Sequence, residues 1–140
     1  MVKNRLFSLF CAVICLLVMT TSAFAQTNRA SDQISNYWMV ATSSNREINV
    51  DFSVTGTGTM DQIGCESIYI YESSGSLWLE VEHFDENDAG MNRTNARKFA
   101  NMVSVDCEVG VKYKVVVTIF AENSDGRDSR TQTFYVTGEV

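Results

Sequence analysis

The chain has 140 residues, with 17 acidic and 11 basic side chains, four cysteines and no proline. Its formal charge of −6 comes without a basic stripe, which argues against nucleic acid and anionic membranes as partners. The absence of proline also excludes a proline-containing sorting signal for attachment to a cell wall.

The first 25 residues are predicted to be a secretory signal peptide. Lys3 and Arg5 form a basic start, residues 6–18 are almost continuously apolar, and an Ala-Phe-Ala sequence gives a small-x-small cleavage site before Gln26. An uncleaved anchor is the alternative, but the apolar run of about 13 residues is shorter than the roughly 20 that a spanning helix needs. We therefore expect a secreted, extracellular protein with no membrane segment in its mature form.

Cleavage at this site leaves 115 residues with a net charge of −8, which is enough chain for one domain with its own core. Residues 26–33 are polar and are expected to form a flexible N-terminus, and residues 34–140 a single domain. Alternating apolar and polar residues between turn signals predict an all-β protein of seven short strands and no helix. The predicted strands cover residues 34–41, 47–54, 66–72, 77–83, 98–107, 110–122 and 130–136.

The strongest strand signal lies at residues 110–122. Tyr113, Val115 and Val117 share one face, and Val116 and Phe120 lie on the other, so both faces are apolar. A strand of this kind needs neighbours that cover it, which predicts a place in the middle of a sheet. By contrast, the Gly- and Thr-rich segment 55–61 predicts a loop with some extended character.

This strand also resembles part of the fibronectin type III domain. Gly110, Tyr113, Val115 and Val117 match the family's glycine, tyrosine and Y-x-V-x-V pattern, and an Ala-x-Asn turn follows at residues 121–123. The resemblance implies a seven-stranded antiparallel immunoglobulin-like β-sandwich of the fibronectin type III kind. It also implies that the Tyr113 hydroxyl forms a tyrosine corner with backbone just upstream.

A second and closer resemblance covers three short segments: residues 54–64 (VTGTGTMDQIG), 68–71 (IYIY) and 90–92 (GMN). They are similar to a group of small secreted proteins of Gram-positive bacteria whose function is uncharacterised. This resemblance implies a bacterial origin, export and one small domain. It implies no functional residues.

Aromatic residues on one predicted sheet face form the main candidate binding face. The strand parity assigns these residues to the core: Ile68, Ile70, Leu77, Leu79, Tyr113, Val115, Val117 and Phe134. It leaves five aromatic side chains on the outer face of one sheet: Tyr69, Tyr71, Trp78, Phe120 and Tyr135. An exposed aromatic patch usually marks a partner or ligand, and such rings suit stacking on sugars or docking of another protein. The alternatives are that Tyr37 and Trp38 of the first strand fold over the patch, or that the parity of one strand is wrong.

Two cysteines, Cys65 and Cys107, remain after cleavage. An even pair in an exported protein favours a disulfide. The predicted topology opposes it, because Cys65 begins the third strand and Cys107 ends the fifth, at opposite ends of the sandwich. A seven-residue strand is about 23 Å long, whereas bonded cysteines need Cα atoms within about 7 Å. The sequence leaves both outcomes open.

No catalytic, cofactor or metal signature emerges. His83, the only histidine, lies near Glu80 and Glu82, but no nucleophile-elbow pattern accompanies it. Residues 85–90 begin like a calcium-binding loop, yet alanines occupy positions five and twelve, so the EF-hand interpretation fails. A weaker calcium site between Asp85 and Asp88 stays open, and no cofactor is expected.

These observations favour a secreted, monomeric, non-catalytic binding or interaction module whose ligand is an unidentified protein or glycan. The alternative is a structural subunit of an extracellular assembly, joined by strand addition at a sheet edge through the polar N-terminal segment. An extracellular hydrolase is disfavoured because the sequence offers no nucleophile–base pair.

Overall fold

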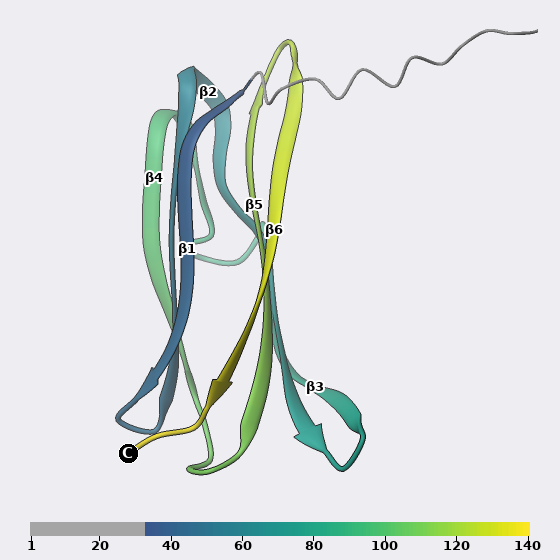
Figure 1. Ribbon diagram of the computed structural model, residues 1–140. Helices are drawn as coiled ribbons and strands as arrows, with labels where there is room; N and C mark the ends of the chain where they lie inside the picture. Colours follow the sequence, from purple (N-terminus) through teal and green to yellow (C-terminus); the bar gives the residue numbers. More distant parts are fainter. Residues whose placement is uncertain (1–32) are drawn as a thin grey trace, which may run out of the picture.

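The computed structural model describes residues 33–140 as an all-β protein (Figure 1). Its strands are β1 (Ile34–Ser44), β2 (Glu47–Ser74), β3 (Leu77–Asp85), β4 (Asn92–Asp106), β5 (Lys112–Asn123) and β6 (Gly126–Thr137). Every pairing between them is antiparallel. The predicted signal peptide and residues 26–32 lie outside the described residues. Within residues 33–140, no helix has the length and hydropathy to span a membrane.

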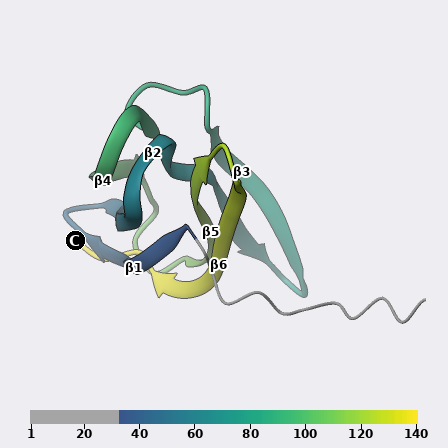
Figure 2. The ribbon, with the colours of Figure 1, turned by 90° about the horizontal axis from the view of Figure 1, so that it is seen from above.

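The sheet is organised around β2. The first half of β2 pairs with β1 and β4, and the second half pairs with β5 and β3. β5 lies between β2 and β6, and β6 in turn contacts β1. The result is one curled antiparallel sheet whose two halves enclose the core. Seen from above, β1 and β6 are neighbours on one side of the molecule, and β3 and β4 lie on the other (Figure 2).

The predicted strands at 47–54 and 66–72 are one continuous strand, so the structure has six strands where the sequence predicts seven. The Gly- and Thr-rich segment between them stays extended because its threonines favour extended backbone and Met60 is buried. Met60 pairs with Ala96 of β4, after a shift of register. Gly56 packs directly against the Met60 side chain, where a Cβ atom would not fit. Glycine thus lets β2 bend from one half of the sheet to the other without ending.

The core lies on the face of β2 and β5 that the alternation predicts. On β2 and β5 the fully or almost fully buried residues follow a period of two: Ile48, Val50, Phe52, Val54, Ile68, Ile70, Tyr113, Val115, Val117 and Ile119. Burial of each such aliphatic or aromatic side chain stabilises the fold by about 1.5–3 kcal/mol. Phe134 of β6 packs against this cluster and is partly buried, as predicted.

The β2–β3 hairpin departs from the predicted core. Leu77 and Leu79 are expected to be buried, yet 64% and 50% of their surfaces are exposed. The ends of β1 and β4 do not cover this hairpin, which diverges from them at its tip (Figure 1). Alternation along β3 therefore predicts the direction in which its side chains point. Whether those side chains are buried depends on whether the opposite half of the sheet covers them.

Both ends of the described chain are tied to turns. Gln33 is buried, its amide N–H donates to Asp128 (2.8 Å), and its side chain donates to Asn123 (3.1 Å). Gln33, the one described residue of the segment 26–33, is therefore anchored to the β5–β6 hairpin. At the other end, the Arg46 amide donates to the Glu139 carbonyl at 2.8 Å, which fixes the C-terminus against the β1–β2 turn.

Candidate functional site

Four of the five predicted aromatic residues come together on the outer face of the half-sheet β3–β2–β5–β6. The register aligns Tyr69 of β2 with His83 of β3. It also places Lys114 of β5 between Tyr71 of β2 and Tyr135 of β6. We call the residues His83, Tyr69, Tyr71, Lys114, Trp78 and Tyr135 the aromatic strip.

The members of the aromatic strip contact one another in sequence across the sheet. Tyr69 stacks on His83 with ring centroids 5.8 Å apart and on Tyr71 at 6.4 Å. The Lys114 ammonium lies 4.4 Å from the Tyr71 ring centroid and 5.5 Å from that of Trp78. Trp78 in turn lies 5.8 Å from Tyr135. These contacts join the rings into one continuous row across the four strands.

The aromatic strip is open to solvent. Tyr135 is 69% exposed and Trp78 is 36% exposed, whereas Tyr69 and Tyr71 are half-buried. The first strand does not cover the strip, because β1 pairs with the first half of β2 instead. A hollow of about 370 Å³ adjoins the end of the strip, and its lining includes Trp78, Tyr135 and the neighbouring Lys112. The strip thus combines exposed ring faces with a concave end.

The fifth predicted member, Phe120, is buried and is not part of the exposed strip. Its parity on β5 is the outer one, as predicted, but the Arg127 guanidinium lies 3.7 Å above its ring. The sequence shows which way Phe120 points. It does not show that a side chain from the next strand covers it.

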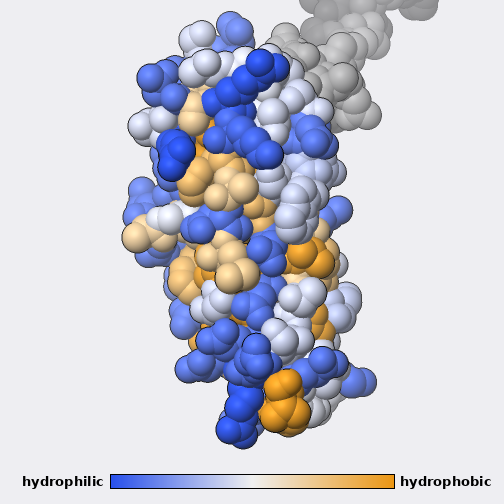
Figure 3. Space-filling view, turned by 90° about the vertical axis from the view of Figure 1, so that its left-hand side faces the viewer, coloured by the Kyte–Doolittle hydropathy of each residue, from blue (hydrophilic) through white to orange (hydrophobic). Residues whose placement is uncertain are grey.

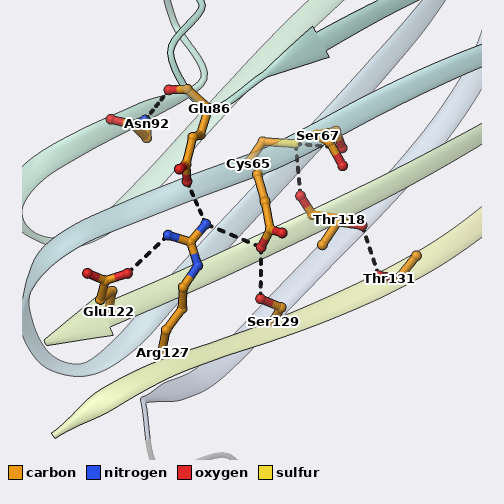
Figure 4. Close-up of polar contacts among 10 residues, drawn as sticks. Cys65, Ser67, Glu86, Asn92, Thr118, Glu122, Arg127, Ser129 and Thr131 are labelled. Atoms are coloured by element: carbon orange, nitrogen blue, oxygen red, sulfur yellow. Dashed lines mark hydrogen bonds and ion pairs between the residues drawn. The ribbon is translucent and has the colours of Figure 1, made fainter.

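Arg127 is held over Phe120 by three carboxylates (Figure 4). Its guanidinium contacts Glu86 at 2.5 Å, Glu122 at 3.0 Å and Glu66 at 3.2 Å. Burial lowers the pKa of Arg127, but the hydrogen bonds with these carboxylates outweigh it, and the net effect is a raised pKa. The cluster joins β2, the β3–β4 loop and the β5–β6 hairpin.

The contact expected of a tyrosine corner is present. The hydroxyl of Tyr113 accepts a hydrogen bond of 2.9 Å from the Glu108 amide, five residues upstream. Tyr113 is almost completely buried. Burial also raises the pKa of its hydroxyl above the ordinary value of 10.0. The bond fixes the turn that leads into β5.

Cys65 and Cys107 are free thiols, so the disulfide that export favours is absent. The Cys65 Sγ donates to the Thr118 carbonyl at 3.2 Å, deep in the second half of β2 (Figure 4). The Cys107 amide donates to the Arg46 carbonyl at 2.8 Å, next to the start of β2. Cys65 pairs with Ile119 in the later part of β5, whereas Cys107 lies beside Tyr113 at the start of β5, so the two thiols are separated along that strand.

The acidic loop after β3 uses its carboxylates on its own backbone. Asp85 accepts from the Asn87 amide at 2.7 Å, and Asp88 accepts from the Asp85 amide at 2.8 Å. Across residues 33–140, no cluster of three or more His, Cys, Asp or Glu side chains is arranged to hold a metal ion. His83 Nδ1 lies 3.2 Å from Glu80, and the His83 ring stacks on Tyr69. These contacts place His83 in the aromatic strip.

Sequence reasoning missed Lys114 and His83 as members of the strip. The signal for Lys114 was present, because it alternates with Val116 on the outer face of β5. His83 reaches that face because the register of β3 shifts between Ile70 and Tyr71, which no sequence pattern indicates.

The chain matches no model of a known protein family, and a search of curated proteins gives no match either.

Proposed function

We propose that this chain is a secreted, non-catalytic binding module, and that its aromatic strip binds a glycan chain. The observation that carries the proposal is the row of rings on an open sheet face, in which Trp78 and Tyr135 are exposed and Tyr69 and Tyr71 are half-buried. The ring faces suit the apolar faces of sugar rings, and an exposed patch of this kind usually marks a binding site.

The polar groups along the strip favour a sugar, rather than the apolar surface of another protein, as the ligand. Lys114, Glu80 and His83 lie among the rings and provide hydrogen-bond donors and acceptors for hydroxyl groups. The hollow beside Trp78 and Tyr135 adds a concave end of about 370 Å³, within the range of small-molecule sites. A linear saccharide fits an elongated strip better than a compact ligand does.

The rest of the chain supports the wider proposal. The basic and apolar start with its Ala-Phe-Ala site supports secretion. The bond between Tyr113 and Glu108, together with the two half-sheets around one core, supports an immunoglobulin-like sandwich of the fibronectin type III kind. On this proposal the protein acts as a monomer and needs no cofactor.

The experiment is a glycan array followed by calorimetry with the best soluble oligosaccharide. We expect Trp78→Ala and Tyr135→Ala each to weaken binding by about tenfold or more, since stacked aromatic contacts are worth roughly 1–3 kcal/mol. Trp38→Ala is the matched control, because Trp38 is 51% exposed but lies on β1, away from the strip. Binding that survives Trp78→Ala would show that the strip is not the site. No glycan binding, with capture of a protein through the same residues, would replace the glycan by a protein ligand.

A further inference from the structure

The edges of the curled sheet differ on its two sides. On one side β1 and β6 are in contact. On the other side β3 and β4 each pair with β2 only, so each has one unpaired edge. Two adjoining hollows of about 420 and 270 Å³ lie there, and Val81 of β3 and Asp106 of β4 line both. We call this opening the β3–β4 groove.

The groove has an apolar floor and an exposed apolar rim. Phe84 and Val105, which line it, are half-buried against the core. Val81, Leu79 and Leu77 continue along β3 and are 48%, 50% and 64% exposed. Seen from the side of β4, apolar side chains also gather in a broken band down the middle of the molecule, between hydrophilic ones (Figure 3). A soluble protein rarely leaves a sheet edge and its side chains uncovered in this way.

The charged residues that line the groove are all acidic. They come from three strands and from the turn after β4: Glu72, Glu82, Asp106 and Glu108. Within the described residues, none of these carboxylates forms an ion pair. Arg46 lines an adjoining hollow together with Asp106 and Glu108. One basic residue against four acidic ones leaves a net negative charge for a cationic ligand to meet at the opening.

We propose that the β3–β4 groove accepts an extended, cationic segment of a partner protein, which adds as a strand to the free edge of β3. The edge supplies backbone hydrogen bonds, and alternate side chains of the added strand point into the groove, where apolar residues meet Leu79 and Val81. Basic residues at its flanks face Glu82 and Asp106. This proposal is independent of the aromatic strip, which lies on the opposite face of the same half-sheet.

Two other occupants fit the groove less well. A second copy paired edge to edge through β3 would add a further acidic strand, with Glu80, Glu82 and Asp85, to an opening whose charged lining is already acidic, and like charges close together are destabilising. Residues 26–32 of the chain, QTNRASD, contain one basic and one acidic residue and no alternating apolar residues. Neither the edge of a second copy nor residues 26–32 offers the combination of basic and apolar side chains that would match the acidic, apolar lining.

One end of β3 is already blocked. The His83 amide donates to the Glu82 side chain at 3.2 Å, and the Asp85 amide donates to Asp88 at 2.8 Å. Carboxylates of the same chain therefore occupy two backbone N–H groups of β3 that an added strand would need. This limits the addition to the part of β3 between Leu77 and Val81.

The experiment uses three synthetic peptides of about seven residues, a common strand length. One has valines at alternate central positions, separated by serines, and lysines at both ends; the second has glutamates in place of the lysines; and the third is the lysine peptide with a central proline. Binding to the purified protein is measured by fluorescence anisotropy, and backbone protection by hydrogen exchange. We expect only the first peptide to bind, with slowed exchange confined to residues 77–81.

The charge requirement is tested with Glu82→Gln combined with Asp106→Asn, which should weaken binding of the lysine peptide by about tenfold. Glu80→Gln is the matched control, because Glu80 lies on the same strand but on the opposite face. Equal binding of the glutamate peptide, protection elsewhere, or no binding of the lysine peptide would each overturn the proposal. A concentration-dependent dimer with protected 77–81 amides and no peptide would identify a second copy as the occupant instead.

Discussion

Cys65 shows how the core controls the chemistry of a single side chain. Its thiol is completely buried and donates to the carbonyls of Thr118 and Ser67, at 3.2 and 3.4 Å. Burial raises the pKa of Cys65 from its ordinary value of 9.0 to about 12. The thiolate is the reactive form of cysteine, so we expect this side chain to be unreactive in the folded protein.

A raised pKa has a defined effect on stability. Because the folded protein holds the Cys65 proton more tightly than the unfolded chain does, its contribution is complete below pH 9 and falls as the pH rises toward 12. The free energy of unfolding should decrease in this window by up to about 1.4 kcal/mol per pH unit. Urea unfolding at several pH values measures the slope.

The control for this prediction is Cys65→Ala. We expect the variant to be less stable at neutral pH, because the substitution leaves a cavity, but to lose less stability between pH 9 and 10. Measurements stay below pH 10 because Tyr113, whose pKa is also raised, adds a loss of the same sign above it. Parallel pH curves for the two proteins would contradict the assignment to Cys65.

At the scale of the elements, the β3–β4 loop passes very close to the backbone of β2 at Gly64. Gly64 lies where β2 has β4 on one side and β5 on the other. The backbone of Met91 and Asn92 passes so near that a Cβ on Gly64 would overlap it. The Cys65 amide, next in the chain, donates to the Met91 carbonyl at 2.7 Å. Glycine is therefore required for the approach of the β3–β4 loop to β2.

Gly64→Ala should lower the free energy of unfolding by about 1–3 kcal/mol, because backbone must move to make room. Gly58→Ala is the matched control on the same strand, since no atom lies within 4 Å of the position that its Cβ would occupy. Chemical denaturation of both variants measures the difference. Equal stability of the two would show that this close approach tolerates a side chain.

The sequence predicted the strands better than their connections or their covering. The alternation at 47–54 and 110–122 gave the buried faces correctly, because apolar periodicity reports side-chain direction. It did not show that β2 continues through its glycines, since pairing with β4 decides that. For the site, all five aromatic side chains point to the outer face, as the alternation predicts. The burial of Phe120, however, depends on Arg127, a contact between strands that no sequence pattern indicates.

For the whole molecule, the fold is held without a covalent cross-link in the described residues. Both thiols are free, and the Sγ atom of Cys107 lies 3.6 Å from the Ser43 hydroxyl instead. Stability at this scale comes from one shared core and from the pairing of four strands with β2. A reducing agent breaks no bond in the core or in the strand pairing, so it should not change the stability of the fold.

We therefore expect the urea unfolding midpoint to be the same with and without dithiothreitol. Alkylation of the folded protein followed by peptide mapping should modify the half-buried Cys107 and leave Cys65 untouched, and unfolding in urea should make both reactive. Cysteines that resist alkylation in urea until a reductant is added would show a bond that contradicts this arrangement.

The length of β2 also has a consequence for the order in which the chain acquires its structure. The second half of β2 has both of its neighbours only when residues up to Asn123 are present, because β5 supplies one of them. Pairings between segments so far apart in sequence form slowly, and until they form they leave strand edges open. During synthesis, most of the chain is therefore expected to stay unfolded until β5 has been made, and then to fold in one late, cooperative step.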